Sequence, residues 1–144
     1  MTSSLPSQPQ TILIVEDDPS LLELCNRFLT SAEFNVLTSD DGYQALKMCK
    51  EHRGRIHLEL IDLMLPPKGM RLKADDGQTL VQGLELAEKL RALRPLSRVL
   101  VMSAYNREEL ATYGIDTKGW PFLQKPFSRE GLLEAVGQAL TQRP

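Results

Sequence analysis

The sequence predicts an α/β fold in which helices cover both faces of a doubly wound, mainly parallel five-stranded sheet. Short apolar runs alternate with amphipathic helical patterns along the chain, as is typical of this class. The first run, residues 11–15, is apolar throughout, which indicates a central parallel strand buried on both faces. At 144 residues the chain is long enough for one domain with a substantial core.

The first half of the chain is predicted to contain three strands, at residues 11–15, 34–38 and about 56–61. Asp18 and Pro19 are of the types that cap and open a helix, so a helix is expected directly after the first strand. Asp41 can cap a second helix over about 43–52, with Gln44 in the reciprocal position of a capping box.

The second half is predicted to contain a helix over about 84–93, strands at 98–102 and about 121–124, and two further helices. Pro95 ends the first of these helices. Asn106 and Glu109 have the spacing of a capping box for the next one. Ser128 is expected to cap the last helix. The pattern over residues 112–119 is ambiguous.

Composition and charge argue against several classes of protein. The net charge of −2 gives no reason to expect a nucleic-acid partner, and no apolar run approaches the length of a membrane span. Residues 1–9 lack the features of a secretion signal and are expected to be a disordered tail of a cytoplasmic protein. Cys25 and Cys49 lack metal-ligand spacing and are expected to be small buried side chains.

Polar residues end or follow four predicted strands: Glu16, Asp17 and Asp18 the first, Asp62 the third, Ser103 the fourth and Lys125 the fifth. Because the carboxyl ends of parallel strands meet at the same edge of a sheet, these residues are expected to converge. Each also has an ordinary explanation, such as a helix cap for Asp18 or a surface charge for Lys125. Three converging carboxylates, however, would repel one another unless a cation lay among them, and oxygen-only ligands suit Mg²⁺.

Four motifs, ILIVEDDP, LELIDLMLP, VLVMSA and FLQKPF, resemble those of the receiver domain of two-component response regulators over nearly the whole chain. The intervals of 45 positions from Asp17 to Asp62 and 22 from Ser103 to Lys125 also resemble the family's within about one residue. The resemblance implies a flavodoxin-like sheet of strand order 2-1-3-4-5 and a receiver domain over residues 10–142. The expected protein is a stand-alone signalling switch without a DNA-binding segment.

The resemblance implies a phosphoacceptor role for Asp62, which would take a phosphoryl group from a sensor histidine kinase or a histidine phosphotransfer protein. Asp17 would bind Mg²⁺ directly, and Glu16 would do so directly or through water. Asp62 and the backbone carbonyl of Met64 would complete the ligands. A carboxylate nucleophile, a divalent ion and one lysine, here Lys125, suffice for phosphoryl transfer, which depends mainly on positioning and charge neutralisation.

The resemblance also implies a switch that reads the phosphoryl group. Ser103 and Lys125 would bind this group, and Pro126 would follow the lysine in a cis peptide. Phe122 matches the aromatic switch residue of the family, although a plain core role satisfies the same pattern. Its inward turn would change a surface of the fourth helix, fifth strand and fifth helix and so control partner binding. The resemblance also allows two phosphorylated copies to form a dimer, and the sequence does not decide between monomer and dimer.

An insertion at about residues 68–82 separates the third strand from the third helix, unlike the usual family pattern. Asp76 and Gly77 within it favour a small β-hairpin over residues 70–81, with a disordered loop as the alternative. We expect this insertion to contact the partner or to shield the phosphoryl group.

Three large side chains also depart from the family pattern. Met64 and Tyr105 correspond to positions that border the path of the hydrolytic water, and their bulk is expected to prolong the phosphorylated state. Trp120 makes the approach to the fifth strand irregular, either as a partner anchor or as a packing residue.

Two other functions compete with the switch. A Mg²⁺-dependent phosphohydrolase could use Asp62 as its nucleophile, but haloacid-dehalogenase-type enzymes need a second carboxylate two residues later, where this chain has Met64. A receiver-like binding scaffold would never be phosphorylated. Flavin binding is disfavoured, because the three acids after the first strand would repel a phosphate.

Overall fold

A computed structural model of the chain describes residues 8–63 and 78–141. The strands in these residues are β1 (Thr11–Val15), β2 (Asn35–Ser39), β3 (Leu58–Asp62), β4 (Arg98–Ser103) and β5 (Phe122–Gln124). They pair in parallel in the order β2-β1-β3-β4-β5, which confirms the predicted flavodoxin-like topology. Their carboxyl ends therefore lie at one edge of the sheet.

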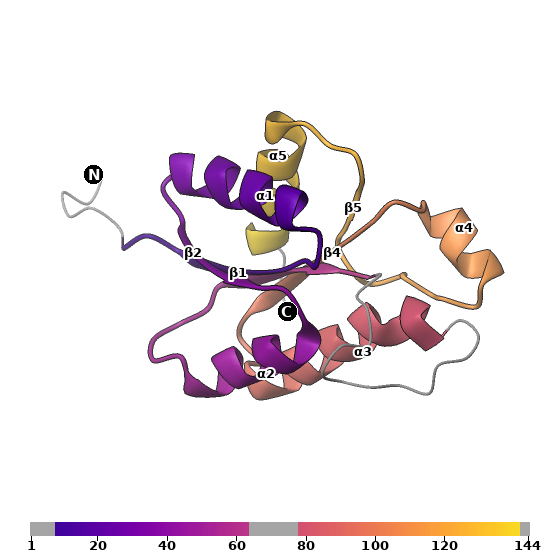
Figure 1. Cartoon of the computed structure of the whole chain (residues 1–144), viewed down its shortest axis with the longest axis horizontal. Helices are drawn as coiled ribbons and strands as arrows, with labels where there is room; N and C mark the ends of the chain where they lie inside the picture. The colour runs from indigo at the N-terminus through magenta and orange to yellow at the C-terminus, as the bar shows by residue number, and fades with distance from the viewer. Residues whose placement is uncertain (1–7, 64–77, 142–144) are drawn as a thin grey trace.

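The described helices are α1 (Pro19–Ser31), α2 (Gly42–Glu51), α3 (Gln78–Leu93), α4 (Arg107–Thr112) and α5 (Arg129–Thr141). α1 and α5 lie on one face of the sheet, and α2 and α3 lie on the other (Figure 1). Ile12 and Ile14 of β1 pack on the α1 side, whereas Leu13 and Val15 pack on the α2 side, which explains why this strand is apolar throughout. Within residues 8–63 and 78–141, no helix has the length and apolar character needed to cross a membrane.

Four helices, α1, α2, α4 and α5, begin where polar side chains accept backbone N–H groups of the first turn. These acceptors are the predicted residues Asp18, Asp41, Asn106 and Ser128. In α4 the capping box is complete, because Asn106 Oδ1 accepts the Glu109 N–H and Glu109 Oε1 accepts the Asn106 N–H, both at 2.8 Å. Gln44 donates its backbone N–H to Asp41 Oδ1 at 2.7 Å. Local side-chain chemistry therefore places these helix starts.

Helix α3 begins at Gln78, whereas the sequence pattern predicted its start near residue 84. The last residues of the hairpin predicted over 70–81 are therefore helical, and that part of the prediction is wrong. The earlier residues of the predicted insertion, 68–77, lie outside the described residues.

Gly83 lies inside α3, where the helix crosses the end of β3. A Cβ atom at this position would lie 2.5 Å from the carbonyl oxygen of Asp62 and 2.5 Å from Cα of Leu63. Real Cβ atoms do not approach other heavy atoms so closely, so the absence of a side chain lets the helix pack directly on this backbone. Gly83 thus positions the strand end that carries Asp62.

The chain between α4 and β5, residues 113–121, is irregular, in line with its ambiguous sequence pattern. Gly114 and Gly119 have positive φ angles of 81° and 86°, which glycine adopts without steric cost. Ile115 and Thr117 are buried, so this segment packs onto the domain. The segment follows α4 and leads directly to Phe122.

Candidate functional site

Three carboxylates converge at the carboxyl edge of the sheet. Asp62 is the last residue of β3, and Glu16 and Asp17 directly follow the neighbouring strand β1. One carboxylate oxygen of each residue lies within 4.8 Å of the other two. Asp62 is 2% exposed and Glu16 is 1% exposed, whereas Asp17 is open to solvent. The sheet order thus produces the convergence that the sequence predicted.

Lys125, which follows β5, reaches the same cluster. Its Nζ lies 3.0 Å from Glu16 Oε1 and 3.3 Å from Asp62 Oδ2. Burial alone would lower the pKa of this ammonium, but the charges of Asp62 and Glu16 raise it overall. Lys125 therefore stays positively charged at neutral pH and offsets part of the negative charge.

The ionised form of Glu16 is disfavoured at its place in the cluster. Burial raises its pKa to about 7, and the charge of Asp62 adds to this effect. The Asp18 N–H, which donates to Glu16 Oε2 at 3.1 Å, and the Lys125 ammonium act in the opposite direction. The two do not bring the pKa back to its ordinary value, so a further positive charge would be favourable here.

The donor atoms of the cluster suit a hard divalent cation. Glu16, Asp17 and Asp62 all offer carboxylate oxygens, which Mg²⁺ prefers, and the exposure of Asp17 leaves an open side for water ligands. The raised pKa of Glu16 points the same way, because a bound cation would favour its ionised form. Met64, whose backbone carbonyl the resemblance adds to this set, lies outside the described residues.

Ser103 ends β4 beside the cluster and is completely buried. Met102 lies opposite Asp62 in the sheet, so Ser103 comes one residue further along the edge. Its Oγ accepts the backbone N–H of Tyr105 at 2.9 Å, and its carbonyl accepts the backbone N–H of Lys125 at 2.8 Å. Ser103 is thereby linked to the loop before α4 and to the lysine that contacts the acids.

The other predicted site residues in the described part of the chain lie in or close after β4 and β5. Phe122 opens β5 and packs, partly buried, against the core on the α2 and α3 face. The peptide bond between Lys125 and Pro126 is cis, the form that the resemblance implied. Tyr105 is half-buried, and its ring lies edge-on to that of Tyr113, with 5.9 Å between their centroids.

The two cysteines are buried, as the sequence predicted, and they lie in helices α1 and α2. Burial raises the pKa of Cys25 to about 12 and that of Cys49 to about 11. Both thiols are therefore protonated at neutral pH and are poor nucleophiles.

Sequence reasoning missed two residues that the structure draws attention to. Glu59, inside β3, is completely buried, although its alternation with leucines in LEL is typical of a half-exposed strand. Its position in a strand predicted to be central was an available signal. Arg107, at the start of α4, binds the segment before β5 at two points, and no local pattern indicates this.

Known proteins resemble this chain in sequence and in fold. Residues 12–137 match the protein family described as the response regulator receiver domain. Response regulator GtcR of Aneurinibacillus migulanus is 32% identical over 133 residues, which are 92% of this chain and 47% of that protein. The chain spans less than half the length of curated relatives such as this one.

Solved structures share the fold. The response regulator receiver protein from Sinorhizobium medicae WSM419 is 26% identical, with a TM-score of 0.71, and the match covers 95% of this chain and 98% of that one. A response regulator protein from Burkholderia pseudomallei with a phosphorylated aspartic acid, calcium ion and citrate is 23% identical, with a TM-score of 0.66. This second match covers 88% of this chain and 66% of that one, and it shows a common fold.

Proposed function

The chain belongs to the response regulator receiver domain family, and on this basis we propose that it is a phosphorylation-controlled switch whose acceptor is Asp62. The observation that carries the proposal is the convergence of two further carboxylates and the Lys125 ammonium on this aspartate. A buried carboxylate is costly unless it is paired or coordinated, and groups of this kind gather at functional sites.

In the proposed reaction, a carboxylate oxygen of Asp62 attacks the phosphorus of a phosphohistidine on a sensor histidine kinase or a histidine phosphotransfer protein. The phosphorus–nitrogen bond of the donor breaks, its electron pair returns to the imidazole ring, and an acyl phosphate forms on this chain. Lys125 Nζ, 3.3 Å from Asp62 Oδ2, is close enough to pair with a phosphoryl oxygen and to offset the added negative charge.

Glu16, Asp17 and Asp62 would hold Mg²⁺ together with the backbone carbonyl of Met64. The ion, when bound, supplies charge neutralisation for the phosphoryl oxygens. The Burkholderia pseudomallei protein contains both a phosphorylated aspartic acid and a calcium ion, which supports a divalent ion beside the acceptor of this chain as well.

Ser103 and Phe122 would convert phosphorylation into a change of surface. A phosphoryl group on Asp62 brings acceptor oxygens beside the Ser103 hydroxyl, which would donate to one of them. Because the Tyr105 N–H donates to that hydroxyl, the loop before α4 would follow it. Phe122, on the neighbouring strand β5, would then pack further inward, and the surface of α4, β5 and α5 would change for a downstream protein.

A hollow of about 320 Å³ beside the site offers a place for the phosphodonor protein. Leu21 and Leu24 of α1 line it on one side, and Lys125, Pro126 and Phe127 line it on the other. Leu24 is 40% exposed, so the hollow combines accessible apolar surface with a direct path to the lysine. We propose that the donor docks across α1 and the loop between β5 and α5.

The proposal is tested by incubating the protein with acetyl phosphate, a small phosphodonor, and measuring intact mass with and without Mg²⁺. We expect one phosphoryl group on the wild type, dependent on Mg²⁺, and none on Asp62→Asn, which loses the nucleophilic oxygen at nearly constant volume. Asp18→Asn is the matched control, because Asn caps a helix as well as Asp does. Repeated turnover of the donor would indicate a phosphohydrolase instead, and the lack of any adduct would indicate a binding scaffold.

A further inference from the structure

The side chain of Arg107 joins the start of α4 to the segment before Phe122. Arg107 is the first residue of α4 and follows Ser103 by four positions. Its Nη1 donates to the carbonyl of Thr117 at 2.6 Å and lies 3.1 Å from Thr117 Oγ1. Its Nη2 donates to the carbonyl of Trp120 at 2.9 Å. One guanidinium thus binds the segment that enters β5 at two points.

The same guanidinium lies over the ring of Phe122, with 4.8 Å between Cζ and the ring centroid. Arg107 itself is exposed, but Thr117 is 3% exposed and Phe122 is partly buried, so water competes least where the guanidinium meets these two residues. Because a guanidinium presents its N–H donors in a rigid planar fork, it holds both carbonyls and the ring in one geometry relative to α4. A shift of Arg107 therefore displaces Phe122 and its approach segment together.

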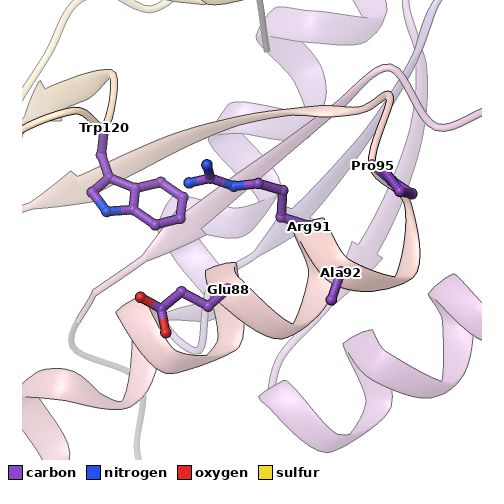
Figure 2. Close-up of a pocket in the computed structure, with 5 residues that line it drawn as sticks. All are labelled: Glu88, Arg91, Ala92, Pro95 and Trp120. Carbon is purple, nitrogen blue, oxygen red and sulfur yellow. The ribbon is translucent and has the colours of Figure 1, made fainter.

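Trp120 extends this connection to α3. Figure 2 shows the guanidinium of Arg91 beside the Trp120 ring, and Cζ lies 4.0 Å from the ring centroid. A hollow of about 590 Å³ opens here, lined by Glu88, Arg91, Ala92, Pro95 and Trp120. The shape of this hollow depends on the position of the indole ring.

We propose that Arg107 is a positioning residue that couples Ser103 to Phe122 and to the surface around Trp120; this inference rests on the proposed function. Tyr105 lies two residues before Arg107, and its backbone N–H donates to Ser103 Oγ. When the Ser103 hydroxyl turns to a phosphoryl group, this N–H follows it or loses its acceptor, and the start of α4 shifts. Arg107 then carries the displacement to the segment before β5.

A purely structural role for Arg107 makes a different prediction from the coupling role. If the arginine only fastens residues 113–121, its loss lowers the free energy of unfolding and leaves the response to phosphorylation intact. If it couples the two segments, its loss uncouples the response while Asp62 still accepts the phosphoryl group. The response per phosphoryl group is therefore the quantity to measure.

Trp120 is the single tryptophan of the chain, so its fluorescence reports on this surface without labelling. Acetyl phosphate with Mg²⁺ should change the tryptophan emission of the wild type, with the phosphoryl group counted by intact mass in the same sample. In Arg107→Ala we expect the emission change per phosphoryl group to fall at least roughly threefold. Circular dichroism checks that the variant is folded. The quantity compared between variants is the change in emission on phosphorylation, because the emission before phosphorylation can differ from that of the wild type.

Two further variants sharpen the test. Arg129→Ala is the matched control, because Arg129 is also the first residue of a helix after a strand, but its Nη2 binds Ser31 Oγ; it should respond as the wild type does. Arg107→Lys keeps the positive charge and loses the fork, so its response should lie between those of the wild type and Arg107→Ala. If Arg107→Ala does not fold, the lysine variant decides the matter: a reduced response supports coupling, and a wild-type response overturns it.

The outcomes separate the inference from the function on which it rests. A phosphorylated wild type with unchanged emission, or an equal emission change in the wild type and Arg107→Ala, overturns the coupling role alone. An equal loss in Arg129→Ala overturns it too, because the effect would then not be specific to Arg107. Failure of the wild type to take up a phosphoryl group overturns the proposed function, and the inference with it.

Discussion

The carboxylates of Glu16, Asp17 and Asp62 determine what this edge of the sheet can do. Their oxygens lie within 4.8 Å of one another, and Lys125 supplies a positive charge at 3.0 Å from Glu16 and 3.3 Å from Asp62. Burial, together with the charge of Asp62, still raises the pKa of Glu16 to about 7, so a bound cation would favour its ionised form. A divalent ion would complete the neutralisation, so ion binding should be measurable as stability.

We predict that Mg²⁺ raises the melting temperature of the wild type, measured by differential scanning calorimetry at constant ionic strength. An ion that binds only the folded state stabilises it by about 2.7 kcal/mol at a hundredfold excess over Kd. Asp17→Asn removes a ligand charge and should need roughly tenfold more Mg²⁺ for the same shift. Asp18→Asn should behave as the wild type. Equal Mg²⁺ requirements for the wild type and Asp17→Asn would contradict the assigned ligand set.

Glu59 is a second buried acid, away from this cluster. It is 0% exposed, and within the described part of the chain its Oε2 has no hydrogen-bond partner. Ser97 Oγ lies 2.9 Å from both Glu59 Oε1 and the carbonyl of Arg94. A hydroxyl has one hydrogen, so Ser97 can donate fully to only one of these two oxygens at a time. Burial raises the pKa of Glu59 to about 7, and the Ser97 hydroxyl and the charge of Arg94 offset only part of this rise.

The raised pKa of Glu59 predicts a loss of stability as pH rises. In the unfolded chain this pKa is 4.5, so between pH 4.5 and about 7 the unfolded state releases a proton that the folded state keeps. The free energy of unfolding therefore falls through this window, by about 3 kcal/mol in total. Glu59→Gln cannot ionise, so relative to the wild type it should gain most of this amount between pH 5 and pH 8.

Urea unfolding of both proteins at pH 5 and pH 8 tests this prediction. Glu16 titrates in the same range in both proteins, so its effect cancels in the comparison. Glu23→Gln, at an exposed position of α1, controls for the loss of one charge. If the wild type and Glu59→Gln show the same difference between the two pH values, Glu59 is ionised in the folded protein at pH 5 and the prediction is wrong.

At the scale of elements, the contact between α3 and the end of β3 positions the acceptor. Gly83 allows this contact, because a Cβ there would lie 2.5 Å from both Asp62 O and Leu63 Cα. Gly137 in α5 offers a matched comparison, since a Cβ at that position would meet no atom within 4 Å. The two glycines share a helical setting and differ in their surroundings.

We predict opposite effects of alanine at these two positions. Gly137→Ala should raise the free energy of unfolding by about 0.5–1 kcal/mol, because alanine favours the helix. Gly83→Ala should lower it by about 1–3 kcal/mol, because the overlap forces α3 away from β3 at a greater cost than the gain in helix propensity. Chemical denaturation measures both. A stabilised Gly83→Ala would show that α3 does not pack on β3 this closely.

Elements were predictable from the sequence where local chemistry decides them. The caps at Asp18, Asp41, Asn106 and Ser128 follow from side chains that bind backbone N–H groups two or three residues away. The start of α3 was predicted too late, because Asp76-Gly77 favours a hairpin and Gly83 is a poor helix former. The same glycine allows the helix to pack on β3, and no local sequence pattern reveals this contact.

At the scale of the whole molecule, the parallel topology explains why the site was predictable. Alternating apolar runs and helical patterns indicate a doubly wound sheet, and such a sheet brings its strand ends to one edge. Glu16, Asp17, Asp62, Ser103 and Lys125 therefore meet although they are far apart in the chain. The contacts of Arg107 could not be predicted in this way, because they depend on the path of an irregular segment.

The central claim is that Asp62 carries the phosphoryl group. Borohydride reduces an aspartyl phosphate to homoserine, which peptide mass spectrometry then assigns to a position. After treatment with acetyl phosphate and Mg²⁺, we predict homoserine at position 62 and at no other aspartate of the chain. Homoserine at Asp17 or at another aspartate, or an unreduced Asp62 in a protein whose intact mass shows a phosphoryl group, would contradict the claim.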